Sequence, residues 1–157
     1  MTKICTHLAL ILCFALFFSC GKEPVICFTP PQPTLIRIVD KEGADLLNPS
    51  NVNGYKFADI SFFYVKNNSK NYSKVKLDSL PNTKIYFLNT DISFNADKGQ
   101  EFSLVLSPTI TDNIYLRNDK VSEKGCAFYK FVEFKYNNVV YNQTKTGDSF
   151  QSYVIVK

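Results

Sequence analysis

Two cysteines, Cys27 and Cys126, have the most specific chemistry in this chain. They form an even pair once Cys20 and the cysteines of the first 19 residues are set aside, for reasons given below. In an oxidising compartment such a pair predicts a disulfide, which would fix the segment around Cys27 to a strand beginning near Cys126. Two alternatives stay open: a reactive thiol or metal site, and two free buried thiols. Two thiolates without a histidine make a poor zinc site.

Histidine is the residue whose scarcity excludes most chemistry. The single histidine, His7, lies in a segment predicted to be removed, so the mature chain cannot form a Ser-His-Asp triad, a Cys-His pair or a histidine metal cluster. Carboxylates remain, above all Asp40, Glu42 and Asp45 around one predicted turn. Their spacing favours a solvated, Asp-capped turn, with a weak calcium site or carboxylate catalysis as alternatives. We therefore expect no catalytic residue, no metal and no cofactor.

Lysines beside tyrosines mark a second candidate, on a predicted hairpin. The candidate contact residues are Lys66, Lys70, Lys74 and Tyr72, with Tyr64 and Lys76 nearby. Such a basic tip could contact acidic glycans or lipid head groups. The alternative is that these are ordinary edge-strand lysines, which oppose aggregation between sheets.

Aromatic residues are abundant, with 14 Phe and 9 Tyr but no Trp. Five tyrosines could form a face on which sugars stack: Tyr115, Tyr129, Tyr136, Tyr141 and Tyr153. The alternative is that these phenols flank a hydrophobic core. The composition itself suits pleated sheets.

The amino-terminal stretch decides where these groups are placed. Lys3 and the free amino terminus supply positive charge, the run from Leu8 to Phe18 is wholly apolar, and Ser19-Cys20-Gly21 are small. This is the layout of a secretory signal. A helix that crosses a bilayer needs about 20 apolar residues, so the run is too short for a lasting span. We expect residues 1–19 to be a signal peptide.

The end of this run, Phe17-Phe18-Ser19-Cys20, resembles the lipobox of bacterial lipoproteins. The resemblance implies that Cys20 is lipidated, for example with palmitate, and becomes the new amino terminus, anchoring the chain to a membrane. The alternatives are cleavage after Gly21, which would release a soluble protein, and an uncleaved anchor. Gly21-Lys22-Glu23 resembles the charged export tags of some Gram-negative lipoproteins. This implies an outer-membrane lipoprotein, and both the surface-exposed and the periplasmic face stay open.

The mature chain divides into a spacer and one domain. Residues 20–33 form a Pro-rich spacer with four prolines, and residues 34–157 have a length typical of a single domain. Of the 18 basic residues only Lys3 lies in the signal, and all 14 acidic residues remain. The mature chain therefore has 17 basic and 14 acidic residues, a net charge of +3. This charge is too mild to argue for nucleic acid as a partner.

Short apolar segments separated by turn residues predict the fold. The expected strands cover residues 34–40, 59–66, 72–77, 84–88, 92–94, 101–106, 110–117, 128–136, 139–141 and 153–156. Asn137-Asn138 is typical of a two-residue hairpin turn. About nine short strands at this spacing indicate an all-β protein with a single antiparallel β-sandwich.

One predicted hairpin resembles a hairpin found in known families of β domains. The stretch IVDKEGADL, residues 38–46, is similar to the first hairpin of transthyretin-like and carboxypeptidase-regulatory-like domains, with Asp40, Gly43 and Leu46 at the matching positions. The resemblance implies an immunoglobulin-like or transthyretin-like sandwich and transfers no function.

As a whole the chain resembles short bacterial lipoproteins in which a Pro-rich spacer precedes one β domain. We expect a non-catalytic, membrane-anchored envelope lipoprotein that acts as a binding or structural module. Its partners would be the membrane, through the lipid anchor, and a glycan or an envelope protein. The alternatives are a glycan-binding accessory module and a carboxylate-dependent secreted hydrolase, which would need two acidic side chains facing one cleft.

Overall fold

The computed structural model describes residues 27–123, 126–146 and 150–157. The predicted signal peptide, Cys20 and the first part of the spacer lie outside these residues. The strands are β1 (Cys27–Thr29), β2 (Thr34–Val39), β3 (Ser61–Lys66), β4 (Ser69–Ser73), β5 (Val75–Ser79), β6 (Tyr86–Thr90), β7 (Gln100–Ser107), β8 (Ile110–Glu123), β9 (Cys126–Tyr136), β10 (Val139–Val140), β11 (Thr144–Thr146) and β12 (Phe150–Val156). Two 3-10 helices, η1 (Phe57–Asp59) and η2 (Ile92–Asn95), join them.

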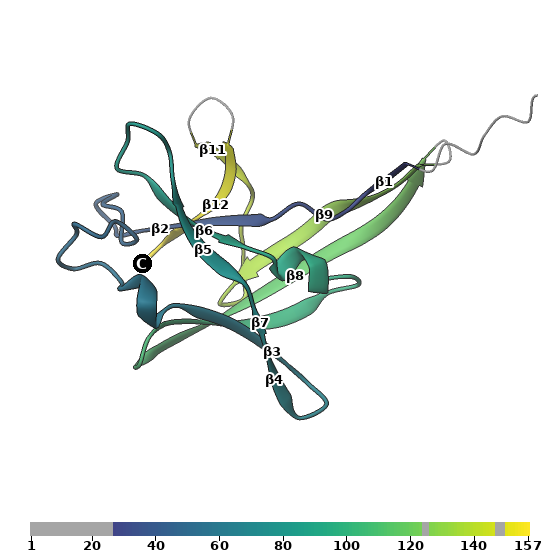
Figure 1. The fold of residues 1–157 in the computed structure, drawn as a ribbon, viewed down its shortest axis with the longest axis horizontal. Coiled ribbons are helices and arrows are strands. Elements are labelled where there is room, and N and C mark those ends of the chain that lie inside the picture. Colours follow the sequence, from purple (N-terminus) through teal and green to yellow (C-terminus); the bar gives the residue numbers. More distant parts are fainter. Residues whose placement is uncertain (1–26, 124–125, 147–149) are drawn as a thin grey trace, which may run out of the picture.

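The described strands form two sheets (Figure 1). One has the order β1-β9-β8-β7-β3-β4, with β10 also on β9, and the other has the order β11-β12-β2-β6-β5. The predicted all-β sandwich is confirmed. One strand pair in each sheet departs from the expected antiparallel arrangement, because β1 runs parallel to β9 and β12 runs parallel to β2.

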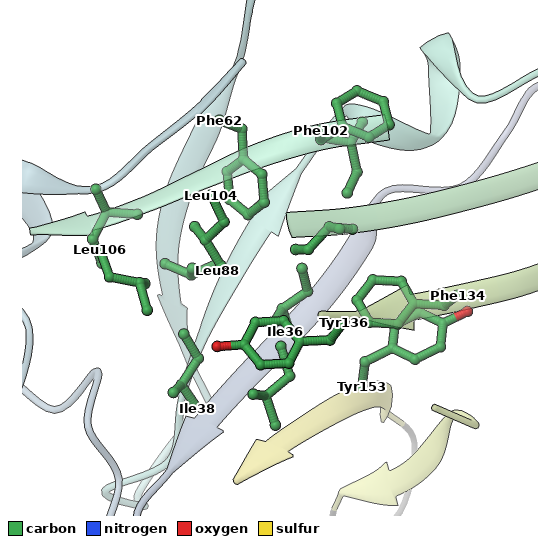
Figure 2. Close-up of a cluster of buried hydrophobic side chains, with 14 of the residues drawn as sticks. Ile36, Ile38, Phe62, Leu88, Phe102, Leu104, Leu106, Phe134, Tyr136 and Tyr153 are labelled. Atoms are coloured by element: carbon green, nitrogen blue, oxygen red, sulfur yellow. The ribbon is translucent and has the colours of Figure 1, made fainter. Parts of the chain in front are cut away.

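The core lies between the sheets, and alternate residues of β2 and β7 point into it (Figure 2). On β7 the predicted inward set of Phe102, Leu104 and Leu106 is buried, and their neighbours are partly or largely exposed. Ile36 and Ile38 of β2 are completely buried in the same cluster. The period of two in the sequence therefore places the apolar faces of β7 and β2 correctly.

Strands β8 and β9 extend beyond the sandwich as a long arm (Figure 1). Their pairing continues from Ile114↔Tyr136 to Glu123↔Cys126, whereas β7 pairs with β8 only as far as Gln100↔Leu116. Strand β1 lies along the outer part of β9, in register from Cys27↔Cys126 to Thr29↔Phe128. Part of the predicted spacer is therefore a strand of the arm.

The prediction of one strand over Tyr72–Leu77 is wrong. The chain leaves the larger sheet after Ser73 and enters the smaller sheet at Val75. Lys74, between them, donates its backbone N–H to Asp91 Oδ1 at 2.9 Å, and its carbonyl accepts from the Thr90 hydroxyl at 2.9 Å. These distant contacts fix the crossing point, which the local pattern does not reveal.

The predicted strand at Ile92–Phe94 is also wrong, because the segment is the 3-10 helix η2 with Ile92 and Ser93 buried. The predicted turn at Asn137-Asn138 is confirmed, and both residues have positive φ, 47° and 68°. Asn67 and Asn68 turn the β3–β4 hairpin in the same way. The expected segment at 110–117 is longer than predicted, since β8 continues to Glu123.

Candidate functional site

The predicted disulfide is present between Cys27 and Cys126, with 4.7 Å between the two Cα atoms. The two residues are direct partners in the parallel β1–β9 register. The bond therefore fastens the outer end of the arm to the start of the described chain. Cys20, the predicted lipidation site, lies seven positions earlier and outside the described residues.

The acidic trio stabilises a loop. Asp40 Oδ1 accepts the N–H groups of Glu42 at 3.1 Å and Ala44 at 2.7 Å, which closes the turn at Gly43. Glu42 is exposed. The Asp40 carboxylate therefore caps the turn, and this geometry matches the Asp-capped alternative.

Asp45 is buried and holds two strands together. Its Oδ1 accepts from Leu47 N at 2.9 Å, and its Oδ2 accepts from Tyr86 N at 2.9 Å. Arg37 lies beside the same carboxylate, with 3.5 Å between Nε and Oδ2. Asp45 therefore joins the loop after β2 to the start of β6.

The predicted lysine-rich tip is only partly assembled. Lys70 and Tyr72 lie on β4 across Phe63, with Lys70 Nζ 4.5 Å from the Phe63 ring centroid and 5.8 Å between the Phe63 and Tyr72 centroids. Val65 pairs with Lys70 and is 59% exposed, and Tyr72 is 67% exposed. We call Phe63, Val65, Lys70 and Tyr72 the hairpin patch.

The remaining predicted contact residues lie outside this patch. Lys66 is exposed at the turn and alternates with Val65, so it belongs to the opposite face of β3. Lys74 lies at the crossing between the two sheets, and Lys76 is on β5 of the smaller sheet. The lysines do not form one cluster.

The predicted tyrosine face does not form, because two of its five members are core residues. Tyr136 is 5% exposed and Tyr153 is 4% exposed. Burial raises the pKa of Tyr153 to about 12, and a hydrogen bond with Gln143 acts in the opposite direction. Tyr136 and Tyr153 therefore fit the alternative, in which these phenols pack at the hydrophobic core.

A polar cluster around Asp112, which the sequence reasoning missed, lies beside the core residue Tyr136. Asp112 Oδ2 accepts from Tyr136 Oη at 2.7 Å and from Lys157 Nζ at 2.6 Å, and Oδ1 accepts from Asn137 Nδ2 at 3.1 Å. Burial raises the pKa of Asp112, but these hydrogen bonds and the charge of Lys157 outweigh it and lower the pKa overall. Burial and Asp112 together raise the pKa of Tyr136. Both carboxylate oxygens of Asp112 have hydrogen-bond partners, which indicates a structural network.

A hollow of about 490 Å³ lies where the root of the arm meets β2 and β12. This size is within the usual range for small-ligand sites. Four side-chain amides and two phenylalanines dominate its wall. The lining residues are Gln32, Pro33, Leu35, Asn89, Phe131, Gln143, Phe150 and Gln151. We call this feature the amide hollow.

Neighbouring side chains hold the two aromatic rings of the amide hollow. Phe150 stacks on Phe87, with 6.4 Å between centroids and 23° between planes. Phe131 meets Tyr153 edge to face at 6.5 Å. Each ring therefore packs against a buried aromatic residue, Phe150 against Phe87 and Phe131 against Tyr153.

The amides of the hollow come from four separate parts of the chain. Gln32 precedes β2, Asn89 is on β6, Gln143 precedes β11 and Gln151 is on β12. Asn89 Nδ2 donates to Asp78 Oδ2 at 2.7 Å, which orients that amide. No local spacing in the sequence relates these residues, so the sequence reasoning missed them.

The described residues include neither a candidate metal centre nor a candidate membrane-spanning helix. No group of three or more His, Cys, Asp or Glu side chains there is placed to hold a metal ion. No helix in the described ranges is long and apolar enough to cross a membrane. In comparisons with family models, curated proteins and solved structures, no match to this chain was found.

Proposed function

We propose that this chain is a non-catalytic, lipid-anchored envelope protein whose β-sandwich binds a neutral saccharide in the amide hollow. The observation that carries the proposal is the chemistry of the wall: none of the eight lining residues has an ionisable side chain. A primary amide has N–H donors and a carbonyl acceptor, a combination that suits the hydroxyl groups of a sugar. The apolar faces of Phe131 and Phe150 suit its C–H surface.

The envelope location is supported by two features. The Cys27–Cys126 disulfide is typical of proteins in oxidising compartments. The resemblance of Phe17-Phe18-Ser19-Cys20 to a lipobox supplies the anchor, and Gly21-Lys22-Glu23 favours the outer membrane. In this proposal residues 1–19 are removed and Cys20 carries the lipid.

We also propose which kind of β-sandwich this domain is. An immunoglobulin-like or transthyretin-like relationship is supported by the hairpin after β2. There Gly43 has φ +85°, Asp40 caps the turn and Leu46 is 7% exposed. Hydrolysis has weaker support, since Asp40 and Asp45 accept hydrogen bonds from the backbone and neither lines the amide hollow.

The test is glycan binding by the full chain, purified in detergent and screened on an array of neutral and acidic glycans. We expect a neutral glycan to bind, and Gln151→Ala or Gln32→Ala to weaken it about 3- to 10-fold, the effect of losing one or two hydrogen bonds. Gln100→Ala is the matched control, because Gln100 is on β7 and outside the hollow. Binding that is insensitive to Gln32 and Gln151 would contradict the proposal.

The hairpin patch supports a second candidate, contact with an envelope protein by strand addition. Strand β4 is at the edge of the larger sheet in the described residues, and Val65 and Tyr72 expose apolar surface beside Lys70. Cross-linking from Tyr72 in intact cells, with Phe57 as the control position, tests this candidate. Equal products from both positions would exclude it.

A further inference from the structure

The arm carries an aromatic and basic face that the amide hollow does not use, in which Phe28 and Lys120 are exposed and Tyr129 is half-buried. Phe28 on β1 is 55% exposed and meets Tyr129 of β9 edge to face, with 6.2 Å between ring centroids. Lys120 of β8 pairs with Tyr129, and its Nζ lies 6.0 Å from the Phe28 ring centroid. We call Phe28, Lys120 and Tyr129 the arm face.

The charges of the arm are divided between its two faces. Asp119 and Glu123 alternate with Lys120 along β8, and they pair with Lys130 and Cys126 of β9. They therefore belong to the opposite face of the arm. Among the described residues, Lys120 is the charged member of the contact set around Phe28 and Tyr129. An aromatic pair with one lysine is the combination found where proteins meet the bilayer interface, because the rings enter the head-group region and the ammonium stays in water.

The anchor places this face close to a membrane. Cys20 precedes Cys27 by seven residues, and a fully extended chain covers at most about 3.6 Å per residue, so Cys27 lies within about 25 Å of the lipidated cysteine. Cys27 is bonded to Cys126 at the outer end of the arm, and Phe28 is the next residue. The disulfide therefore prevents the domain from moving away from its tether by peeling β1 off β9.

We infer that the outer end of the arm rests on the phospholipid head-group layer through Phe28, Tyr129 and Lys120, and that the arm holds the sandwich off the bilayer. This inference rests on the lipid anchor of the proposed function and does not depend on the ligand of the amide hollow. The occupant of the arm face is the bilayer itself, since at most about 25 Å of chain separates Cys27 from the lipidated Cys20.

The absence of tryptophan allows a direct test. Because the chain has no Trp, Phe28→Trp introduces a single tryptophan that can be excited selectively. The full chain, purified as a lipoprotein, is reconstituted into phosphatidylcholine–phosphatidylglycerol vesicles that contain lipids brominated near the head group. Tyr72→Trp, on the exposed hairpin patch, is the matched control. Tyr129→Trp is a second reporter in case Phe28→Trp does not fold.

We expect the emission of the arm reporters to shift to the blue and to be quenched at least twofold more than that of Tyr72→Trp. Equal quenching of the arm and control reporters, in protein whose intact mass shows acylated Cys20, would overturn the inference and leave the anchor standing. An unacylated mass would contradict the anchor itself, and the inference would fall with it. The two failures are thus separated by one mass measurement on the same sample.

Discussion

The ring of Phe134 on β9 stacks on the ring of Tyr153 on β12, with 3.9 Å between centroids and 12° between planes (Figure 2). The two residues belong to different sheets, and both are almost fully buried. This contact therefore joins the sheets at the root of the arm. Tyr153 also supports Phe131, which lines the amide hollow, so the same contact links the core to the candidate site.

Truncating Phe134 tests this link. We expect Phe134→Ala to lower the free energy of unfolding by about 3–5 kcal/mol, because a large buried ring is lost and a cavity remains. Val132→Ala on the same strand is the control, since Val132 is 41% exposed and should cost less than about 1 kcal/mol. Urea denaturation of both variants measures the difference. Equal costs would show that the stack does not join the sheets.

Removing the disulfide should loosen the arm. The bond closes a loop across a sequence separation of 99, so replacing both cysteines by serine should cost about 2–5 kcal/mol. Hydrogen exchange should rise most at the backbone amides of β1 and the outer half of β9, because their pairing begins at Cys27↔Cys126. Ser122→Ala on the arm is the control. Unchanged stability and exchange would contradict a role for the disulfide in holding β1 on the arm.

Asp112 should make stability depend on pH in the acid range. Its pKa is lowered from 3.8 by the hydrogen bonds of Lys157, Tyr136 and Asn137, which outweigh burial, so its contribution is present above about pH 4 and is lost as the pH falls through the folded-state pKa.

We expect Asp112→Asn to cost about 1–3 kcal/mol at pH 7, the effect of disrupting a partly buried charged hydrogen bond, and this cost should shrink below pH 4. Denaturation midpoints from pH 2 to pH 7 measure it. Asp59→Asn, at an exposed residue of η1, should leave the pH profile unchanged. A cost for Asp112→Asn that does not vary with pH would show that the charge is not involved.

Alanine substitutions at two glycines distinguish the cost of backbone strain from the cost of a side-chain clash. Gly43 and Gly99 both have positive φ, but a Cβ on Gly43 would meet nothing within 4 Å, whereas a Cβ on Gly99 would lie 2.9 Å from Tyr115 Cζ. We expect Gly43→Ala to cost about 1 kcal/mol for the left-handed backbone and Gly99→Ala to cost clearly more. Adding Tyr115→Ala should recover the excess at Gly99. No recovery in the double variant would contradict the proposed clash.

Local pattern predicts much of this fold. The alternation of Phe102, Leu104 and Leu106 places β7 correctly, and Asn137-Asn138 specifies the turn between β9 and β10. The crossing at Lys74 was not predictable, because it depends on Asp91 and Thr90 in a distant segment. The short apolar run at Ile92 fits a strand equally well by pattern, and only burial in the assembled core distinguishes a helical turn.

The candidate site was less predictable than the fold. The Cys27–Cys126 bond follows from counting cysteines, because a chain that is expected to be exported leaves each of these two cysteines one possible partner. No residue count or spacing in the sequence predicts the amide hollow. Gln32, Asn89 and Gln151 are brought together only by the strand order β12-β2-β6. The tyrosines predicted to bind sugar are partly core residues for the same reason, as Tyr136 and Tyr153 show.

We propose that Cys20 anchors this domain to the envelope membrane. Intact-mass and peptide mass spectrometry of the protein extracted from membranes tests it most directly, with Cys20→Ala as the control. We expect a mature chain that begins at Cys20 and carries acyl chains, whereas the control should not be acylated. A mature amino terminus at another residue, or an unmodified Cys20, would contradict the account.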